Sequence, residues 1–252
     1  MKKKSPGTAA ADTTDWCLDG FGRPAGKNPV ISPLASTKFY CPMREDSVAW
    51  EESDTFNPAA TIYNDEIVVL YRAEDNSAQG IGSRTSRLGY ATSNDGVNFI
   101  RKTTPAFYPA KDSQEANECP GGTEDPRVAM TEDGTYVLLY TQWNRKVPRL
   151  AVATSKDLVN WTKYGPAFAK AYGGKFYDEP SKSASIVTTM KDGKQVITKI
   201  NGKYFMYWGE QNVYAATSDN LTDWEPLVDK DGNLLKLFSP RPGKFDSHLT
   251  EC

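Results

Sequence analysis

Histidine is almost absent from this chain of 252 residues, and cysteine is scarce. The only histidine is His248, so a three-histidine metal site is excluded, and a Ser-His-Asp triad would have to use this residue near the C-terminus. The four cysteines are Cys17, Cys41, Cys119 and Cys252. They form no CxxC pair, so neither a structural zinc site nor a disulfide framework is predicted. One disulfide bond is possible, but the sequence does not identify its two cysteines. Carboxylate chemistry remains open.

Long apolar runs and an excess of either charge are also missing. No segment approaches the roughly 20 apolar residues of a spanning helix, so no membrane span is predicted. The 30 basic and 32 acidic residues nearly cancel, which predicts no nucleic-acid partner. No residue pattern requires a metal or an organic cofactor, and none is predicted.

The N-terminus has the charge of an export signal without its apolar segment. Met1–Lys4 is basic, but residues 5–14 are small and polar. Either a signal has been removed, or these residues belong to a cytoplasmic protein. We predict an irregular arm over residues 1–27 and one domain over residues 28–252.

Aromatic residues and an internal repeat are what the sequence has in quantity. The 13 tyrosines, 10 phenylalanines and 6 tryptophans are typical of sheet-rich folds. An Ala-Thr-Ser triplet occurs at 91–93, 153–155 and 216–218, at spacings of 62 and 63 residues. Six residues after each serine stands an aromatic that should fill the gap between repeats: Phe99, Trp161 and Trp224.

Each repeat also contains matching strand patterns. Strands are predicted at 57–63 and 66–72, at 124–130 and 135–143, and at 183–189 and 203–210. Self-similarity at this period with about four strands per repeat is typical of a β-propeller. Three complete repeats are followed by a fourth that starts at Phe245, so we expect an all-β, incomplete propeller of about four blades or fewer.

The segment Gly121–Met130 opens the second repeat and contains Glu124-Asp125-Pro126-Arg127. Pro126 should hold Asp125 extended at the start of an inner strand, and strand alternation should point Glu124 away from Asp125. Inner strands of successive blades line one channel, so Asn57, Asp125, residues 183–185 and Asp246 should converge. Such polar groups suit sugar binding and acid-base catalysis, although a water-filled channel would give the same pattern.

Five motifs in order resemble glycoside hydrolase family 130, the five-bladed propellers that include β-mannoside phosphorylases and β-1,2-mannosidases. They lie at 48–75, 86–99, 121–128, 197–210 and 245–251. The resemblance implies that Asp125 is the catalytic acid, which in the phosphorylases acts through a hydroxyl of the bound mannose. It implies that Lys199 contacts phosphate, and that the terminal mannose is held by Asn57, Arg72, Asp75, Ser86, Arg87 and Asp246. The family's last blade is lacking after the fifth motif, so a truncated chain is expected.

The attacking group decides between hydrolysis and phosphorolysis. Glu210 stands where similar phosphorylases carry basic residues, and its carboxylate would repel phosphate and could activate water about 6.5–9.5 Å from the acid. Asp178 and Glu179 offer a second base, while Arg145, Arg149 and Lys199 are candidate cations for phosphate.

We therefore predict an exo-acting, inverting glycosidase that releases mannose from the non-reducing end of β-1,2-linked mannosides, with Asp125 as acid and Glu210 as base. The alternatives are a phosphorylase yielding mannose-1-phosphate and an inactive, truncated glycan-binding propeller. The generic blade pattern alone also leaves open other propeller glycosidases that act on arabinans or fructans. The expected partner is a β-mannoside oligosaccharide, and open sheet edges allow a homo-oligomer. A hydrolase should be secreted or periplasmic, and a phosphorylase cytoplasmic.

Overall fold

The computed structural model describes residues 22–249. Most of the predicted arm, including Met1–Lys4 and Cys17, lies outside these residues, as do Cys252 and the end of the fifth motif. Within the described part of the chain, Cys41 and Cys119 are free thiols. No helix between residues 22 and 249 has the length and apolar character needed to cross a bilayer.

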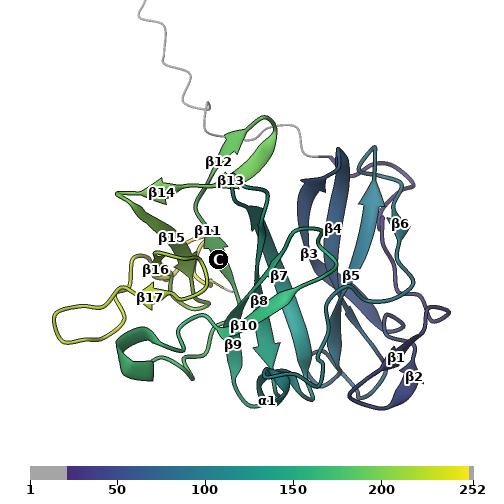
Figure 1. Cartoon of the computed structure of the whole chain (residues 1–252), viewed down its shortest axis with the longest axis horizontal. Helices are drawn as coiled ribbons and strands as arrows, with labels where there is room; N and C mark the ends of the chain where they lie inside the picture. Colours follow the sequence, from purple (N-terminus) through teal and green to yellow (C-terminus); the bar gives the residue numbers. More distant parts are fainter. Residues whose placement is uncertain (1–21, 250–252) are drawn as a thin grey trace, which may run out of the picture.

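The fold is all-β and consists mainly of three four-stranded antiparallel units, which we call blades 1 to 3 (Figure 1). In each blade the strands follow one another in the sheet, and the first strand lies innermost. Blade 1 contains β3 (Asp54–Tyr63), β4 (Glu66–Glu74), β5 (Ser86–Ser93) and β6 (Ile100–Arg101). Blade 2 contains β7 (Gly122–Met130), β8 (Tyr136–Trp143), β9 (Pro148–Ser155) and β10 (Thr162–Pro166). Blade 3 contains β11 (Ala184–Ile186), β15 (Lys203–Trp208), β16 (Tyr214–Ser218) and β17 (Glu225–Pro226).

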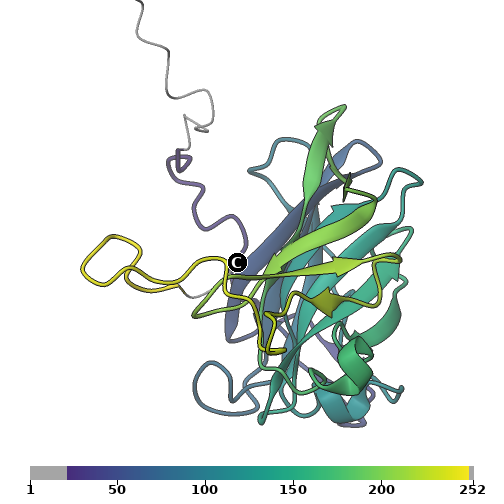
Figure 2. The same cartoon turned by 90° about the vertical axis from the view of Figure 1, so that its left-hand side faces the viewer.

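Smaller elements join or flank the blades. The hairpin of β12 (Thr188–Lys191) and β13 (Lys194–Ile197) rises above blade 3 (Figures 1 and 2). The remaining elements are β1 (Phe39–Cys41), β2 (Asp46–Val48), β14 (Lys199–Ile200), the short helix α1 (Glu115–Glu118) and the 3-10 turn η1 (Ala171–Gly174). None of the sheets in residues 22–249 closes on itself, so the predicted total of five blades stays a prediction.

The Ala-Thr-Ser repeat is explained by a turn that occurs at the same place in all three blades. In blade 2, Ser155 Oγ accepts hydrogen bonds from the backbone N–H groups of Asp157 (3.1 Å) and Leu158 (2.8 Å). Asp157 then accepts from the next two N–H groups through Oδ1. Ser93 with Asp95, and Ser218 with Asn220, make the same pattern. The serine satisfies the turn's backbone donors, which accounts for its recurrence.

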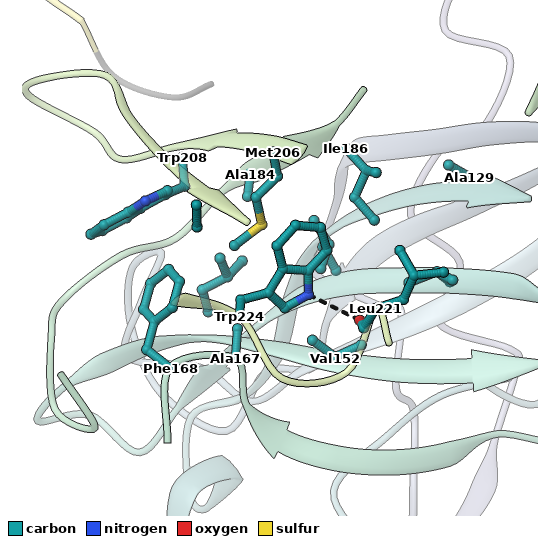
Figure 3. Packing of buried hydrophobic residues seen from close by; sticks show 14 of the residues in the cluster. Ala129, Val152, Ala167, Phe168, Ala184, Ile186, Met206, Trp208, Leu221 and Trp224 are labelled. Atoms are coloured by element: carbon teal, nitrogen blue, oxygen red, sulfur yellow. Dashed lines mark hydrogen bonds between the residues drawn. The ribbon is translucent and has the colours of Figure 1, made fainter. Parts of the chain in front are cut away.

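The tryptophans that follow the second and third turns pack between neighbouring elements, as predicted, whereas Phe99 packs against residues of blade 1, β1 and β2. Trp224 is 1% exposed and lies against Val152, Ala167 and Phe168 of blade 2 and its following loop, and its Nε1 donates to the Leu221 carbonyl (Figure 3). Trp161 meets Phe107 edge to face, with ring centroids 5.8 Å apart. Burial of these rings is a large part of what fixes one blade on the next.

Candidate active site

The inner strands of blades 1 and 2 are interrupted by the same irregularity. The pairing of β3 with β4 shifts between Phe56 and Ala59, and the pairing of β7 with β8 shifts between Glu124 and Arg127. Each bulge contains a residue with positive φ directly before a proline: Asn57 at 43° and Asp125 at 47°. Proline has no N–H for the ladder, and Asn and Asp tolerate the left-handed region better than other side chains. The extended conformation predicted for Asp125 is therefore wrong.

The two bulges bring their side chains together across the junction of the blades. Asn57 Nδ2 donates to Asp125 Oδ1 at 2.8 Å, and Arg72 Nη1 donates to the same oxygen at 3.0 Å. Asp125 is only 1% exposed. Since both donors reach Oδ1, Oδ2 is the oxygen that remains for a proton directed at a substrate. Asn57, Arg72 and Asp125 thus meet as the sequence predicted.

Glu124 joins the same cluster, which contradicts the prediction that it points away from Asp125. Arg72 Nη2 donates to Glu124 Oε1 at 2.8 Å, while Arg72 Nη1 holds Asp125. The bulge breaks the strict alternation of the strand, so two successive carboxylates reach one guanidinium. Burial raises the pKa of Glu124 to about 7, against the opposing effect of Arg72.

Glu74 and Ser86 complete this group, which we call the Arg72 cluster: Arg72, Glu74, Ser86, Glu124 and Asp125. Glu74 Oε1 accepts from Arg72 Nη2 at 2.7 Å, and Ser86 Oγ lies 3.1 Å from Glu74 Oε1. All five side chains are nearly fully buried. Sequence reasoning missed Glu74 and Glu124. The signal for Glu74 was its spacing of two from Arg72, which places both on one face of β4.

Asp75 and Arg87 do not join the Arg72 cluster. Arg87 is opposite Ala73 in the register of β4 and β5, so its side chain leaves the sheet on the face opposite to that of Arg72. There Arg87 Nη1 donates to Asp75 Oδ2 at 2.9 Å, and Arg87 lies beside Cys41 and the Phe39 ring. Although burial opposes it, Arg87 holds the pKa of Asp75 below its usual range. Asp75 and Arg87 thus pair with each other and not with Asp125, and their predicted contact with mannose stays a prediction.

Lys199 is also separated from Asp125, which corrects its predicted place beside the reaction. It is exposed on β14, with Nζ 4.7 Å from the centroid of the Tyr204 ring. The neighbouring β13 pairs with β7 through Val196 and Met130. Met130 lies five residues beyond Asp125, or on the order of 15 Å along a strand. Lys199 therefore lies toward the other end of the inner strand.

Glu210 and Asp246 are placed without a direct link to Asp125. Glu210 is partly buried just beyond β15, where the N–H of Gly209 donates to the Ser183 carbonyl at 3.3 Å. Ser183 follows Lys182, whose carbonyl accepts a hydrogen bond from the Thr141 hydroxyl. Thr141 on β8 is opposite Glu124 on β7. Glu210 therefore lies at the same end of the blades as Asp125. Asp246 Oδ2 accepts from Arg241 Nε at 2.7 Å in the C-terminal loop.

The inner strands of the three blades surround one cavity, as predicted for a channel. It measures about 290 Å³ and is lined by residues of β3, β7 and β11, among them Pro58, Arg127 and Ser185. Asn57 precedes Pro58, and Asp125 lies two residues before Arg127, so the two bulges lead directly into strand residues that line this cavity. In the described residues, no three histidine, cysteine or carboxylate side chains are placed to hold a metal ion.

An all-β fold of repeated blades with a buried carboxylate on a strand that lines a central cavity is an arrangement of carbohydrate-active propellers. A family model described as "beta-1,4-mannooligosaccharide phosphorylase" matches residues 28–250. The chain belongs to glycoside hydrolase family 130.

Individual relatives agree with this assignment. A 1,2-beta-oligomannan phosphorylase of Thermoanaerobacter sp. (strain X514) is 35% identical over 201 residues, which cover 78% of this chain and 56% of the relative. The chain thus spans little more than half of that curated protein. A solved structure from Parabacteroides distasonis ATCC 8503, provisionally described as a glycoside hydrolase, is 81% identical, with a TM-score of 0.92 over 95% of this chain and 68% of the other.

A further solved structure is 65% identical, with a TM-score of 0.92 over 94% of this chain and 66% of the other. Its description states that the family 130 of mannoside phosphorylases contains glycoside hydrolases that target β-1,2 mannosidic linkages in Candida mannan. Family members are thus enzymes that act on β-mannosides.

Proposed function

We propose that this chain forms the acid-bearing and sugar-binding part of an enzyme that cleaves β-1,2-linked mannosides by phosphorolysis. The observation that carries the proposal is the buried Asp125, whose Oδ1 is fixed by Asn57 and Arg72 from the neighbouring blade. With one oxygen held, the other can carry a proton in a defined direction, which is the geometry a general acid needs.

The reaction follows from this placement. A phosphate oxygen forms a bond to the anomeric carbon of the terminal mannose while the glycosidic bond breaks, and the proton of Asp125 passes to the leaving oxygen through a hydroxyl of the bound mannose. The products are mannose-1-phosphate and a mannoside shortened by one unit. The curated relative and the family description both support phosphorolysis, better than they support the hydrolysis that the sequence favoured.

Arg149 is the cation best placed to take phosphate. It is opposite Gln142 in β8, and Gln142 is opposite Thr123 in β7, so Arg149 lies at the end of blade 2 that carries Asp125. Its Nε donates to Asp178 Oδ1 at 2.9 Å. Since the side chain of Asp178 is 67% exposed, a phosphate could replace that carboxylate on a guanidinium suited to bidentate anion binding.

Hydrolysis is the second candidate, and one placement favours it. Glu210 lies at the same end of the blades as Asp125, and a carboxylate there could activate water. The 65% identical structure, described with β-1,2-mannoside hydrolases, supports this alternative. For an inverting hydrolase, the carboxyl groups of Glu210 and Asp125 should lie about 6.5–9.5 Å apart, and this separation stays a prediction.

One assay separates the two reactions. The purified protein is incubated with β-1,2-mannobiose, with and without inorganic phosphate, and mannose and mannose-1-phosphate are quantified. Phosphorolysis requires phosphate for any turnover, and Arg149→Gln should raise the KM for phosphate, whereas the exposed Glu132→Gln should not. Equal release of mannose without phosphate would replace phosphorolysis by hydrolysis. No turnover under either condition would reject both.

The place of action follows from the reaction and is a proposal of the same kind. Phosphorolysis favours the cytoplasm, where phosphate and the sugar phosphate are retained, and hydrolysis favours export to the periplasm or medium. Cell fractionation with an antibody against the chain tests this directly, because the two locations give the protein in different fractions.

A further inference from the structure

Three carboxylates converge on a single guanidinium in the Arg72 cluster. Arg72 Nη2 donates to Glu74 Oε1 at 2.7 Å and to Glu124 Oε1 at 2.8 Å, and Nη1 donates to Asp125 Oδ1 at 3.0 Å. Two further cations are near the cluster: Arg84 Nη1 lies 3.7 Å from Glu74 Oε2, and Lys182 faces Glu124. If all three carboxyls were ionised, buried negative charge would exceed the charge of Arg72 by two, which is costly for side chains that are nearly fully buried.

The hydroxyl of Ser86 shows where a proton is needed. Ser86 Oγ lies 3.1 Å from Glu74 Oε1 and 3.0 Å from Glu124 Oε1, and it accepts a hydrogen bond from Arg72 Nε at 3.1 Å. A hydroxyl has one proton and two lone pairs. Ser86 can therefore donate to only one of the two glutamates. Its contact with the other is a hydrogen bond only if that glutamate carries a proton and donates it to Oγ.

We propose that Glu74 and Glu124 share one proton through the Ser86 hydroxyl, and that this Glu-Ser-Glu unit positions Asp125 by keeping Arg72 bound to it. In one arrangement Glu124 donates its proton to Ser86 Oγ, and Ser86 donates its own to Glu74. When both protons shift, Glu74 holds the extra proton instead, so no charge is created and Ser86 keeps its hydrogen bonds to both glutamates. The positioning role rests on the proposed function, whereas the shared proton does not.

The surroundings place the proton mainly on Glu124. Arg84 lies 3.7 Å from Glu74 Oε2, and Lys182 faces Glu124, but Asp125 stands next to Glu124 and opposes its ionisation. Glu124 faces Arg72 from β4, Ser86 from β5, Asp125 on its own strand and Lys182 ahead of β11, and it is 2% exposed. Burial raises the pKa of Glu124 to about 7, in agreement with a carboxyl that stays protonated into the neutral range.

The consequence for Asp125 is electrostatic. While the shared proton is present, Arg72 faces one ionised glutamate and donates a hydrogen bond to Asp125 Oδ1. Above neutral pH the shared proton is lost, and both glutamates become anions that compete for Nη2 of Arg72. The hydrogen bond from Arg72 Nη1 to Asp125 Oδ1 then weakens. Glu74 and Glu124 are thus positioning residues that act through Arg72.

Carboxyl titration tests the proton directly. The full protein, with glutamate labelled by ¹³C at the side-chain carboxyl, is followed by NMR from about pH 5 to 9. We expect one glutamate signal to titrate near neutrality. It should be absent in Glu124→Gln and should move down by at least about one pH unit in Glu74→Gln, because Ser86 can then donate to an ionised Glu124. Glu132→Gln, at an exposed turn, should leave it unchanged.

Several results would overturn the proposal. The first is that no glutamate titrates above about pH 6 in the unmodified protein, and the second is that the signal persists in Glu124→Gln. The third is an unchanged titration midpoint in Glu74→Gln, which would assign the raised pKa to burial alone. If Glu124→Gln does not fold, the unmodified protein and Glu74→Gln still decide. The positioning role is read separately from the pH profile of kcat/KM, whose alkaline limb should change in Glu74→Gln and stay constant in Glu132→Gln. An unchanged limb would refute positioning, whereas a protein that cleaves no β-mannoside would refute the proposed function and leave the titration result intact.

Discussion

Arg72 and Arg87 lie on opposite faces of the same two strands, and both are almost fully buried, yet they have opposite surroundings. Arg87 meets one carboxylate, Asp75, whose other donors are the N–H groups of Ser77 and Thr85. Arg72 meets three carboxylates on the face toward blade 2. The Arg87–Asp75 pair is balanced and keeps its acid ionised. The Arg72 cluster has three carboxyl groups around one guanidinium, and such an excess of carboxyl groups favours the protonated form of one of them.

Removal of Arg72 should have the largest effect on stability. Arg72→Met leaves three buried carboxylates without their common cation, so we expect a loss of about 3–5 kcal/mol in the free energy of unfolding at neutral pH. Urea denaturation measures the loss. Acidification should recover part of it, because protonated carboxyls no longer need the guanidinium. A loss below about 1 kcal/mol would contradict the view that Arg72 organises the cluster.

The corresponding change on the other face should cost less. Arg87→Met removes one charged donor from Asp75, which keeps two backbone donors and Arg44 Nη1 at 4.0 Å, so we expect a loss of about 2 kcal/mol, typical of one hydrogen-bonded charge. The same urea experiment applies. Acidification should recover less here than in Arg72→Met. Equal losses in the two variants would remove the contrast between a balanced pair and an acid-rich cluster.

The excess of carboxyl groups should also appear in the pH dependence of stability. The pKa of Glu124 is about 7 in the folded protein and ordinary in the unfolded chain, so between about pH 4.5 and 7 the folded state binds more protons. Stability should fall as pH rises through this window, by up to about 1.4 kcal/mol per pH unit. Urea midpoints across this range should lose that slope in Glu124→Gln.

A control is needed because burial also raises the pKa of Glu118, which contributes a slope of the same sign. That contribution is present in both proteins, so the difference between the unmodified protein and Glu124→Gln isolates Glu124. An identical slope in the two proteins would contradict the raised pKa.

The smallest effect is expected at the repeated turns, far from both arginines. Ser155→Ala removes a hydroxyl that accepts two backbone N–H groups, and should cost about 1 kcal/mol. The equivalent changes Ser93→Ala and Ser218→Ala should cost similar amounts, as thermal unfolding can show. None of the three should alter the slope with pH. A serine variant that changed this slope would show that the turns and the Arg72 cluster are not independent.

The repeat made most of the fold predictable. Five of the six predicted strands are confirmed, because alternation is a local property of each repeat. The sixth, at 183–189, is divided at Val187 between β11 and β12, which belong to different sheets. The meeting of Asn57 and Asp125 was also predictable, since equivalent positions of successive inner strands must face one channel. Arg72, on β4, was expected there only from the family resemblance.

The conformation of Asp125 and the direction of Glu124 were not predictable in this way. Regular alternation is the default for a strand, and the bulge at Asp125-Pro126 departs from it, so Glu124 turns toward Arg72 instead of away. The same bulge at Asn57-Pro58 was the available signal, because a proline inside a strand marks an interruption of the ladder. The separation of Asp75 and Arg87 from Asp125 depends on which face of blade 1 meets blade 2, and no local pattern carries that information.

The central claim is that Asp125 is the acid of a β-mannoside-cleaving enzyme, and its replacement by asparagine is the most direct test. Asp125→Asn keeps the size of the side chain and its contact with Asn57, but it cannot donate the required proton. The kcat/KM for β-1,2-mannobiose, measured with phosphate present, should fall by about 10²–10⁴-fold while circular dichroism shows an intact fold, and Glu132→Gln should remain at the unmodified value. A folded Asp125→Asn variant with unchanged kcat/KM would contradict the account.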